Sequence, residues 1–150
     1  MSTHSELAIE LFLKGYNCSQ SVFAAFCDET GMDTNTALKL ASSFGGGMGR
    51  LREVCGAVTG MLMVIGMKYG YTDVSDKKAK AEHYRIVQDL AKQFEKEYGS
   101  IICRELLGLS MKTDSPVPDD RNENYYKKRP CTEFVEQAAK LLDEYINNKI

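Results

Sequence analysis

The chain has 150 residues, of which 43% are hydrophobic and 27% are charged, the composition of an ordinary soluble globular domain. A formal net charge of −2 gives no reason to expect nucleic acid or an anionic membrane surface as a partner. The longest apolar run, residues 54–67, is interrupted by glycines and is shorter than the roughly 20 residues that span a bilayer. Residues 1–15 hold no basic region followed by a cleavage site, so no signal peptide is expected. These features predict a cytoplasmic protein that forms one domain over residues 1–150.

Apolar residues recur every three or four positions along most of the chain, and no segment alternates in the manner of a strand. We therefore predict an all-α fold, a compact single-domain bundle of about six helices, with a glycine-rich loop before a central apolar helix. Asn17 and either Asp33 or Thr34 are the expected N-caps of the second and third helices. Helical segments are predicted at about residues 5–14, 18–30, 34–44, 52–69, 75–98, 101–107 and 130–147.

The segment 110–129 lacks helical periodicity and is rich in Pro and Asp. Loops of this length in compact domains are usually functional or disordered. We expect a mobile polar loop as far as Asn124, and we expect the end of the segment, residues 125–129, to lie over Cys131.

Glycines are concentrated around the central apolar helix. The run at residues 45–49 lacks the third glycine of a dinucleotide-binding fingerprint and the Gly-Lys-Ser/Thr ending of a P-loop. We expect it to let the backbone pass close to a cofactor or a neighbouring helix. Gly56 and Gly60 are four residues apart, which favours close helix packing, and Gly56 also leaves room beside the sulfur of Cys55.

Four of the five cysteines share one position in the predicted elements, the first turn of a helix. They are Cys18, Cys55, Cys103 and Cys131. The unpaired N–H groups and the macrodipole of a helix start favour a thiolate, which is the form that binds metals and attacks disulfides. Arg52, Arg104 and Arg129 stand near three of these cysteines in the sequence and are expected to lower their pKa further. The pattern therefore predicts sulfur chemistry.

The fifth cysteine, Cys27, serves as an internal comparison. It lies nine residues after Cys18 on the same predicted helix, which places it on roughly the opposite face and away from the helix start. We expect it to be a small buried hydrophobic residue.

The spacing of the other four cysteines matches no common local motif. No Cys-x-x-Cys pair is present, so the signatures of a thioredoxin-like dithiol, a zinc ribbon and a ferredoxin are all missing. A joint site must then be assembled by the tertiary fold. Among other candidate groups, His4 lies near a terminus expected to fray, His83 is expected to be structural, and Glu53 is expected to be a solvated carboxylate.

The sequence also resembles a known family. Cys55-Gly56-Ala57-Val58-Thr59-Gly60 is similar to the C-G-A-x-x-G motif of a small family of redox-active proteins, which carry one further cysteine before the motif and two after it. Cys18, Cys103 and Cys131 match these three cysteines in order, and Cys27 lies outside the pattern. The resemblance implies a compact helical protein with a four-cysteine redox or iron–sulfur site.

Three functions are left open at this stage. The leading hypothesis is an electron-transfer or redox-sensing protein whose four cysteines bind an iron–sulfur cluster. The second is a metal-free thiol–disulfide oxidoreductase with Cys55 as the nucleophile, because this residue combines a helix start, Arg52 and permissive glycines. The third is an interaction module held by a structural zinc ion. A homodimer formed through the glycine-bearing helix is compatible with each of them, and the redox partner is unknown.

Overall fold

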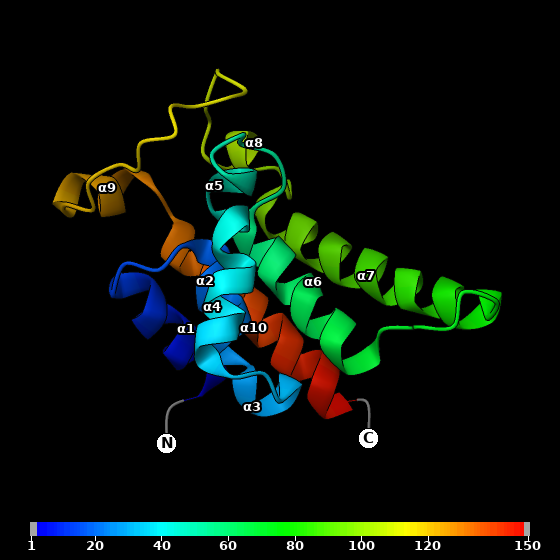
Figure 1. Cartoon of the computed structure of the whole chain (residues 1–150). Coiled ribbons are helices and arrows are strands. Elements are labelled where there is room, and N and C mark those ends of the chain that lie inside the picture. Colours follow the sequence, from blue (N-terminus) through cyan, green and yellow to red (C-terminus); the bar gives the residue numbers. More distant parts are fainter. Residues whose placement is uncertain (1–2, 149–150) are drawn as a thin grey trace.

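Helices provide the regular structure of residues 3–148, the part of the chain that the computed structural model describes (Figure 1). They are α1 His4–Leu13, α2 Cys18–Ala25, α3 Cys27–Thr30, α4 Thr34–Ala41, η1 Ser42–Phe44, α5 Gly45–Met48, α6 Gly56–Tyr69, α7 Lys77–Tyr98, α8 Cys103–Leu106, α9 Glu123–Lys128 and α10 Cys131–Asn148. Over these residues no strand forms beyond one isolated antiparallel bridge between Val54 and Ile102. The all-α prediction is confirmed. No helix in the described range is both long enough and apolar enough to cross a membrane.

The core lies where α2 meets α1, α6 and α10 (Figure 1). Its largest fully buried apolar side chains include Phe12, Phe23, Phe26, Met61 and Leu142. The predicted capping of α2 is present, since the Asn17 side chain accepts a hydrogen bond from the Gln20 backbone N–H and the Gln20 side chain accepts one from the Asn17 backbone N–H. This reciprocal cap fixes the start of α2, the element on which the other core helices pack.

The close contact between α2 and α6 depends on two glycines of α6. A Cβ on Gly60 would lie 2.8 Å from the carbonyl oxygen of Ser19, and a Cβ on Gly56 would lie 3.2 Å from the Cβ of Cys18. Ser19 is fully buried at this crossing. The prediction that these glycines permit close packing is confirmed. Because this face is occupied within the chain, the homodimer that the sequence left open has no assigned surface.

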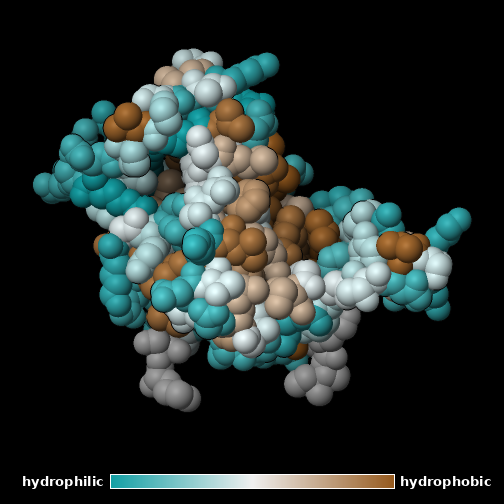
Figure 2. Space-filling model, in the orientation of Figure 1, coloured by the Kyte–Doolittle hydropathy of each residue, from teal (hydrophilic) through white to brown (hydrophobic). Residues whose placement is uncertain are grey.

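Helix α7 is the least covered of the long helices. Its N-terminal end projects from the bundle together with the loop that follows α6 (Figure 1). Of its residues only Leu90 and Phe94 are buried, and Tyr84 near its N-terminal end is about half exposed. Figure 2 shows apolar surface between the body of the bundle and this projecting end.

Three differences from the predicted elements matter for the site. The predicted second helix breaks at Phe26, so that Cys27 begins the separate short helix α3. The apolar helix begins at Gly56 rather than near Arg52, because the residues before it pair in an extended conformation with the chain around Ile102. The segment 110–129 contains the short helix α9, which sequence periodicity did not indicate.

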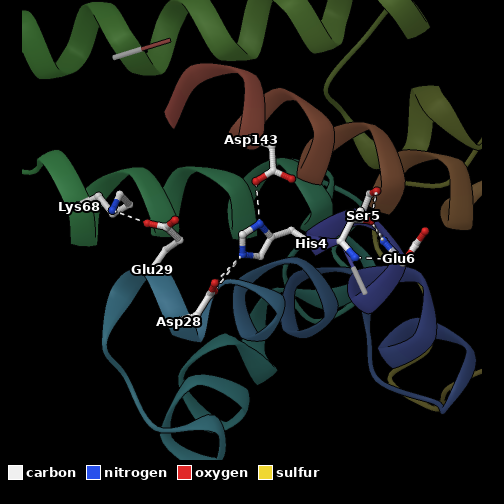
Figure 3. A network of polar contacts seen from close by, with 8 residues as sticks. His4, Ser5, Glu6, Asp28, Glu29, Lys68 and Asp143 are labelled. Carbon is white, nitrogen blue, oxygen red and sulfur yellow. Dashed lines mark hydrogen bonds and ion pairs between the residues drawn. The ribbon is translucent and has the colours of Figure 1, made fainter. Parts of the chain in front are cut away.

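His4 links three helices (Figure 3), and the start of α1, where it lies, is at the end of the bundle remote from α5 (Figure 1). Its Nδ1 lies 2.7 Å from Asp143 of α10, its Nε2 lies 2.9 Å from Asp28 of α3, and its ring stacks on Phe26 at a centroid distance of 4.1 Å. The expectation that His4 frays was wrong, since Thr3 caps α1 and the imidazole is held between two carboxylates. Burial opposes the charged ring, but the hydrogen bonds and charges of Asp28 and Asp143 prevail and raise the pKa of His4.

Candidate functional site

The four cysteines at helix starts surround one cavity. Cys18, Cys103 and Cys131 are the first residues of α2, α8 and α10, and Cys55 is the N-cap of α6. All four line a cavity of about 290 Å³, together with the glycine-rich loop and part of the segment 110–129. The predicted helix-start positions are confirmed. Residues up to 113 positions apart in sequence, from Cys18 to Cys131, are thus brought to a single site.

Backbone pairing brings Cys55 and Cys103 together. The amide of Cys55 donates to the carbonyl of Ile101 at 2.8 Å, and the amide of Cys103 donates to the carbonyl of Glu53 at 2.6 Å. This short antiparallel pairing holds the two chain segments next to each other immediately before α6 and α8 begin. Glu53 itself forms an ion pair with Arg104 at 3.1 Å, so its carboxylate serves this local structure.

The glycine-rich loop forms a turn of left-handed helix. Residues 46–50 all have φ between 61° and 71°, and the amide of Gly49 donates to the carbonyl of Gly45 as in a helical turn. A Cβ on Gly47 would lie 2.7 Å from the Cβ of Cys103, so the expected close approach of the backbone occurs at this cysteine. The non-glycine residues Met48 and Arg50 in the turn each carry a conformational cost of about 1–2 kcal/mol. Such strain is concentrated at functional sites.

Arg52 also has a positive φ, 59°, and this conformation decides which sulfur its side chain meets. Its Nη1 lies 3.6 Å from the Sγ of Cys103. The sequence had suggested Cys55 as its partner, and that assignment was wrong. Burial raises the pKa of Cys103, and the Arg52 guanidinium opposes this rise.

Burial outweighs the helix-start effect at Cys55. Burial raises the pKa of the Cys55 thiol to about 12, even though the backbone N–H groups of Ala57 and Val58 donate to the sulfur. The expectation that the helix starts would lower the pKa of all four thiols was wrong for this reason. A sequence reveals a helix start but not how completely water is excluded from it.

Cys18 and Cys131 form a pair in hydrogen-bond contact, with the Cys18 thiol as the donor. The hydrogen bond from Cys18 lowers the pKa of Cys131 against the effect of burial, and Arg129 and Arg121 lower it further. The same contact, together with burial, raises the pKa of Cys18 well above its ordinary value. Cys131 is therefore the site cysteine with a lowered pKa, and the predicted effect of Arg129 on it is confirmed.

Cys27 does not line this cavity. It is partly exposed rather than buried as expected, because the helix that would have carried it inward ends before it. His83 also lies outside the cavity, on α7, where its ring contacts Tyr71 edge-on. Both residues are therefore separate from the four-cysteine site, as the sequence had suggested.

The segment 110–129 is tied to the site by a chain of ion pairs. Asp114 contacts Arg52 at 2.8 Å and Arg50 at 3.1 Å, while Asp119 contacts Arg50 at 3.2 Å and Arg129 at 2.9 Å. The sequence had suggested a mobile polar loop for most of this segment and gave no signal for these long-range pairs. We call the five residues the arginine–aspartate chain. It runs from Arg52, which contacts Cys103, to Arg129, which lies two residues before Cys131 in the sequence.

Two more residues of this segment complete the wall of the cavity. Tyr125 lines it, in agreement with the expectation that residues 125–129 lie over Cys131, and burial raises the pKa of this tyrosine to about 12. Arg121 donates to the backbone carbonyls of Phe12 and Tyr16, and its guanidinium lies 4.1 Å from the Phe12 ring centroid. These contacts join the segment to the end of α1.

The four thiols that line the cavity are the groups that could hold a metal ion or a cluster. Within residues 3–148, no three side chains of His, Cys, Asp or Glu are positioned to hold one ion. An iron–sulfur cluster instead distributes its cysteine ligands over several iron atoms. The space lined by all four cysteines, the N–H groups that donate to Cys55 and the guanidinium at Cys103 fit the donor set and the hydrogen bonding of such a cluster.

Comparisons with known proteins identify the family. No curated protein and no solved structure matches this chain. Residues 16–145 match a family described as "Putative redox-active protein (C_GCAxxG_C_C)". The chain carries the motif as Cys55-Gly56-Ala57-Val58-Thr59-Gly60, in which the first two residues stand in the opposite order to the letters of that description, and its other site cysteines follow the described order. Since the match covers most of the sequence, the chain belongs to this family of redox-active proteins with four cysteines.

Proposed function

We propose that this protein transfers electrons or senses redox state through an iron–sulfur cluster bound by Cys18, Cys55, Cys103 and Cys131. The observation that carries the proposal is that four thiols from four separate helix starts line one cavity. Four cysteines complete the ligand set of a [2Fe–2S] or [4Fe–4S] cluster. When bound, such a cluster supplies one-electron transfer.

The protein's own residues would adjust the charge and the hydrogen bonding at the sulfurs. The amides of Ala57 and Val58 donate to Cys55, and Arg52 donates to Cys103. These contacts stabilise negative charge on sulfur, and hydrogen bonds to cluster sulfurs are among the factors that set a reduction potential. Gly47 and Gly56 keep the backbone close to the site without side chains that would fill the space.

Burial supports the same proposal. Cys55, Cys103 and Cys131 are each less than 10% exposed, and Phe12 and Phe134 line the cavity beside them. A site that excludes water limits hydrolysis and unwanted oxidation of a bound cofactor. A reducing cytoplasm is the compartment in which we place the protein, because thiols persist there.

The test is anaerobic purification followed by a visible spectrum and analysis of iron, acid-labile sulfide and zinc on one sample. We expect broad visible absorption and both iron and sulfide. The absorption should be lost when any of the four site cysteines is changed to Ser and retained in Cys27→Ser, the matched control. Protein that binds no iron after reconstitution under reducing conditions would contradict the proposal.

A specific contact favours a second candidate, metal-free thiol–disulfide exchange at the pair Cys18 and Cys131. The Cys131 thiolate would attack a disulfide of the redox partner and release one partner thiolate. Cys18 would then lose its proton and attack the mixed disulfide, which releases the second partner thiolate and leaves a Cys18–Cys131 disulfide. Cys55 as nucleophile stays a prediction, and its raised pKa favours Cys131 for this role.

Differential alkylation with mass spectrometry separates this candidate from the cluster. A reversible loss of two hydrogen atoms confined to Cys18 and Cys131 would support exchange chemistry. The protein is treated with oxidised glutathione at a potential that oxidises dithiols. If Cys18 and Cys131 stay reduced under this treatment, the result counts against disulfide exchange.

A further inference from the structure

The cavity contains a buried cation whose hydrogen bonding is incomplete. Arg52 is only 2% exposed and lines the cavity. Its Nη1 faces Cys103 and its Nη2 donates to Asp114 at 2.8 Å, but its Nε–H is buried without a partner anywhere in residues 3–148. Buried donors are nearly always paired, so an unpaired guanidinium N–H at a cavity wall calls for an acceptor from outside the chain, either a water molecule or a bound ligand.

The charges around the cavity point to the same type of ligand. The arginine–aspartate chain contains three arginines and two aspartates, and it ends in a cation on both sides, Arg52 beside Cys103 and Arg129 beside Cys131. Arg121 also lines the cavity and pairs with carbonyl groups rather than with a carboxylate. Four guanidinium groups and two carboxylates leave a surplus of two positive charges.

We propose that this cavity binds a small oxyanion between Arg52 and Arg129, beside the cysteine sulfurs. A guanidinium presents its N–H donors in a planar fork that matches two oxygens of an oxyanion, a carboxylate or a phosphate group. The ligand class is therefore an inorganic oxyanion or a small metabolite that carries such a group. Arg52 offers its free Nε–H, and Arg129, which is 19% exposed, is accessible from solvent.

This inference rests on the proposed function only in placing the ligand next to a redox site. The positive surplus could instead be neutralised entirely by negative charge on the sulfurs or on a bound cluster. In that case no additional anion would be held once the site is loaded. Binding must therefore be measured on both the metal-free reduced protein and the iron-loaded protein.

The experiment is isothermal titration of each form with sulfate, phosphate and acetate at constant ionic strength. We expect saturable binding of at least one of these anions to both forms, with one site per chain. Arg52→Lys keeps the positive charge and removes the Nε–H, and Arg129→Gln removes a solvent-accessible cation. Each should weaken binding by about tenfold or more, the effect of losing one charge-assisted hydrogen bond. Arg85→Gln, an exposed arginine of α7, is the matched control and should change nothing.

The outcomes separate the two proposals. Saturable binding to both forms that is weakened by Arg52→Lys and Arg129→Gln supports the anion site, whether sulfate and phosphate or acetate bind best. If the protein loads iron and sulfide but neither form binds any of the three anions, the anion site is refuted and the cluster proposal stands. If the protein loads iron and sulfide and the anion binds only to the metal-free form, the anion site is also refuted. If the anion binds and iron does not, the anion site is supported and the cluster proposal fails. Equal weakening by Arg85→Gln would identify nonspecific surface binding and overturn the inference.

Discussion

Replacing Gly60 by Ala should destabilise the protein, whereas replacing Gly66 by Ala on the same helix should stabilise it. Both glycines lie within α6 and both substitutions gain about 1 kcal/mol of helix propensity. A Cβ at Gly66 meets nothing within 4 Å, whereas a Cβ at Gly60 would lie 2.8 Å from the backbone oxygen of Ser19 and 3.1 Å from the Cβ of Val22. Because a backbone carbonyl cannot rotate away as a side chain can, α2 and α6 must move apart to accommodate the new Cβ at position 60.

The expected difference in the free energy of unfolding follows from helix propensity, which is the same for both substitutions, and from overpacking, which is not. Overpacking a tight contact costs typically about 1–3 kcal/mol, and this cost is absent at Gly66. The two alanine variants should therefore differ by about 1–3 kcal/mol in the free energy of unfolding, with Gly66→Ala at or above the wild type. At about 2–4 °C per kcal/mol for a protein of this size, their Tm values should differ by roughly 2–12 °C.

Urea unfolding followed by circular dichroism measures this difference directly, with wild type, Gly60→Ala and Gly66→Ala at equal concentration. The m-values should agree, which would show that only stability has changed. If Gly60→Ala is as stable as Gly66→Ala, α2 and α6 do not meet through this glycine, and the explanation for the close contact between these two helices fails.

Three further predictions concern titration. Arg52→Gln should raise the pKa of Cys103, because the guanidinium opposes the effect of burial, and the pH dependence of alkylation at Cys103 in the metal-free protein measures this. Cys18→Ala should raise the pKa of Cys131 by removing the hydrogen bond that lowers it, so that alkylation of Cys131 at neutral pH slows, and an unchanged rate would contradict the pairing. His4→Asn should destabilise the protein most below about pH 6, near the ordinary histidine pKa of about 6.5, because a raised folded-state pKa contributes stability that is complete below the unfolded pKa. That difference in unfolding free energy should shrink as the pH rises through the folded-state pKa, and a difference that grows with pH would refute it.

The helical fold and the location of the site could be read from the sequence because local signals specify them. Asn17 and Asp33 cap α2 and α4 as expected, and each site cysteine stands at a helix start. Capping and periodicity act over a few residues, so a single sequence records them. The packing role of Gly56 and Gly60 could also be predicted, because their spacing on one helix face is a local property.

The electrostatics of the site could not be read in this way. Arg52 is three residues from Cys55 in sequence, yet its left-handed backbone directs its side chain to Cys103. The pairing of Asp114 with Arg52 spans 62 residues and depends on the tertiary fold. Burial, which raises the pKa of Cys55, is likewise a property of the completed core. His4 was misjudged because its partners Asp28 and Asp143 come from distant helices.

The placement of one site cysteine at the start of each of α2, α6, α8 and α10 has a consequence for biosynthesis. The ribosome makes Cys18 early and Cys131 late, so a nascent chain lacks the complete set of site cysteines until α10 has emerged and packed against α1 and α2. A peptide segment of this protein could not capture a cofactor in the way that a ferredoxin loop with closely spaced cysteines can. Under the proposed function, delivery of the cluster would follow folding, and any delivery protein would have to recognise a folded domain rather than a linear motif.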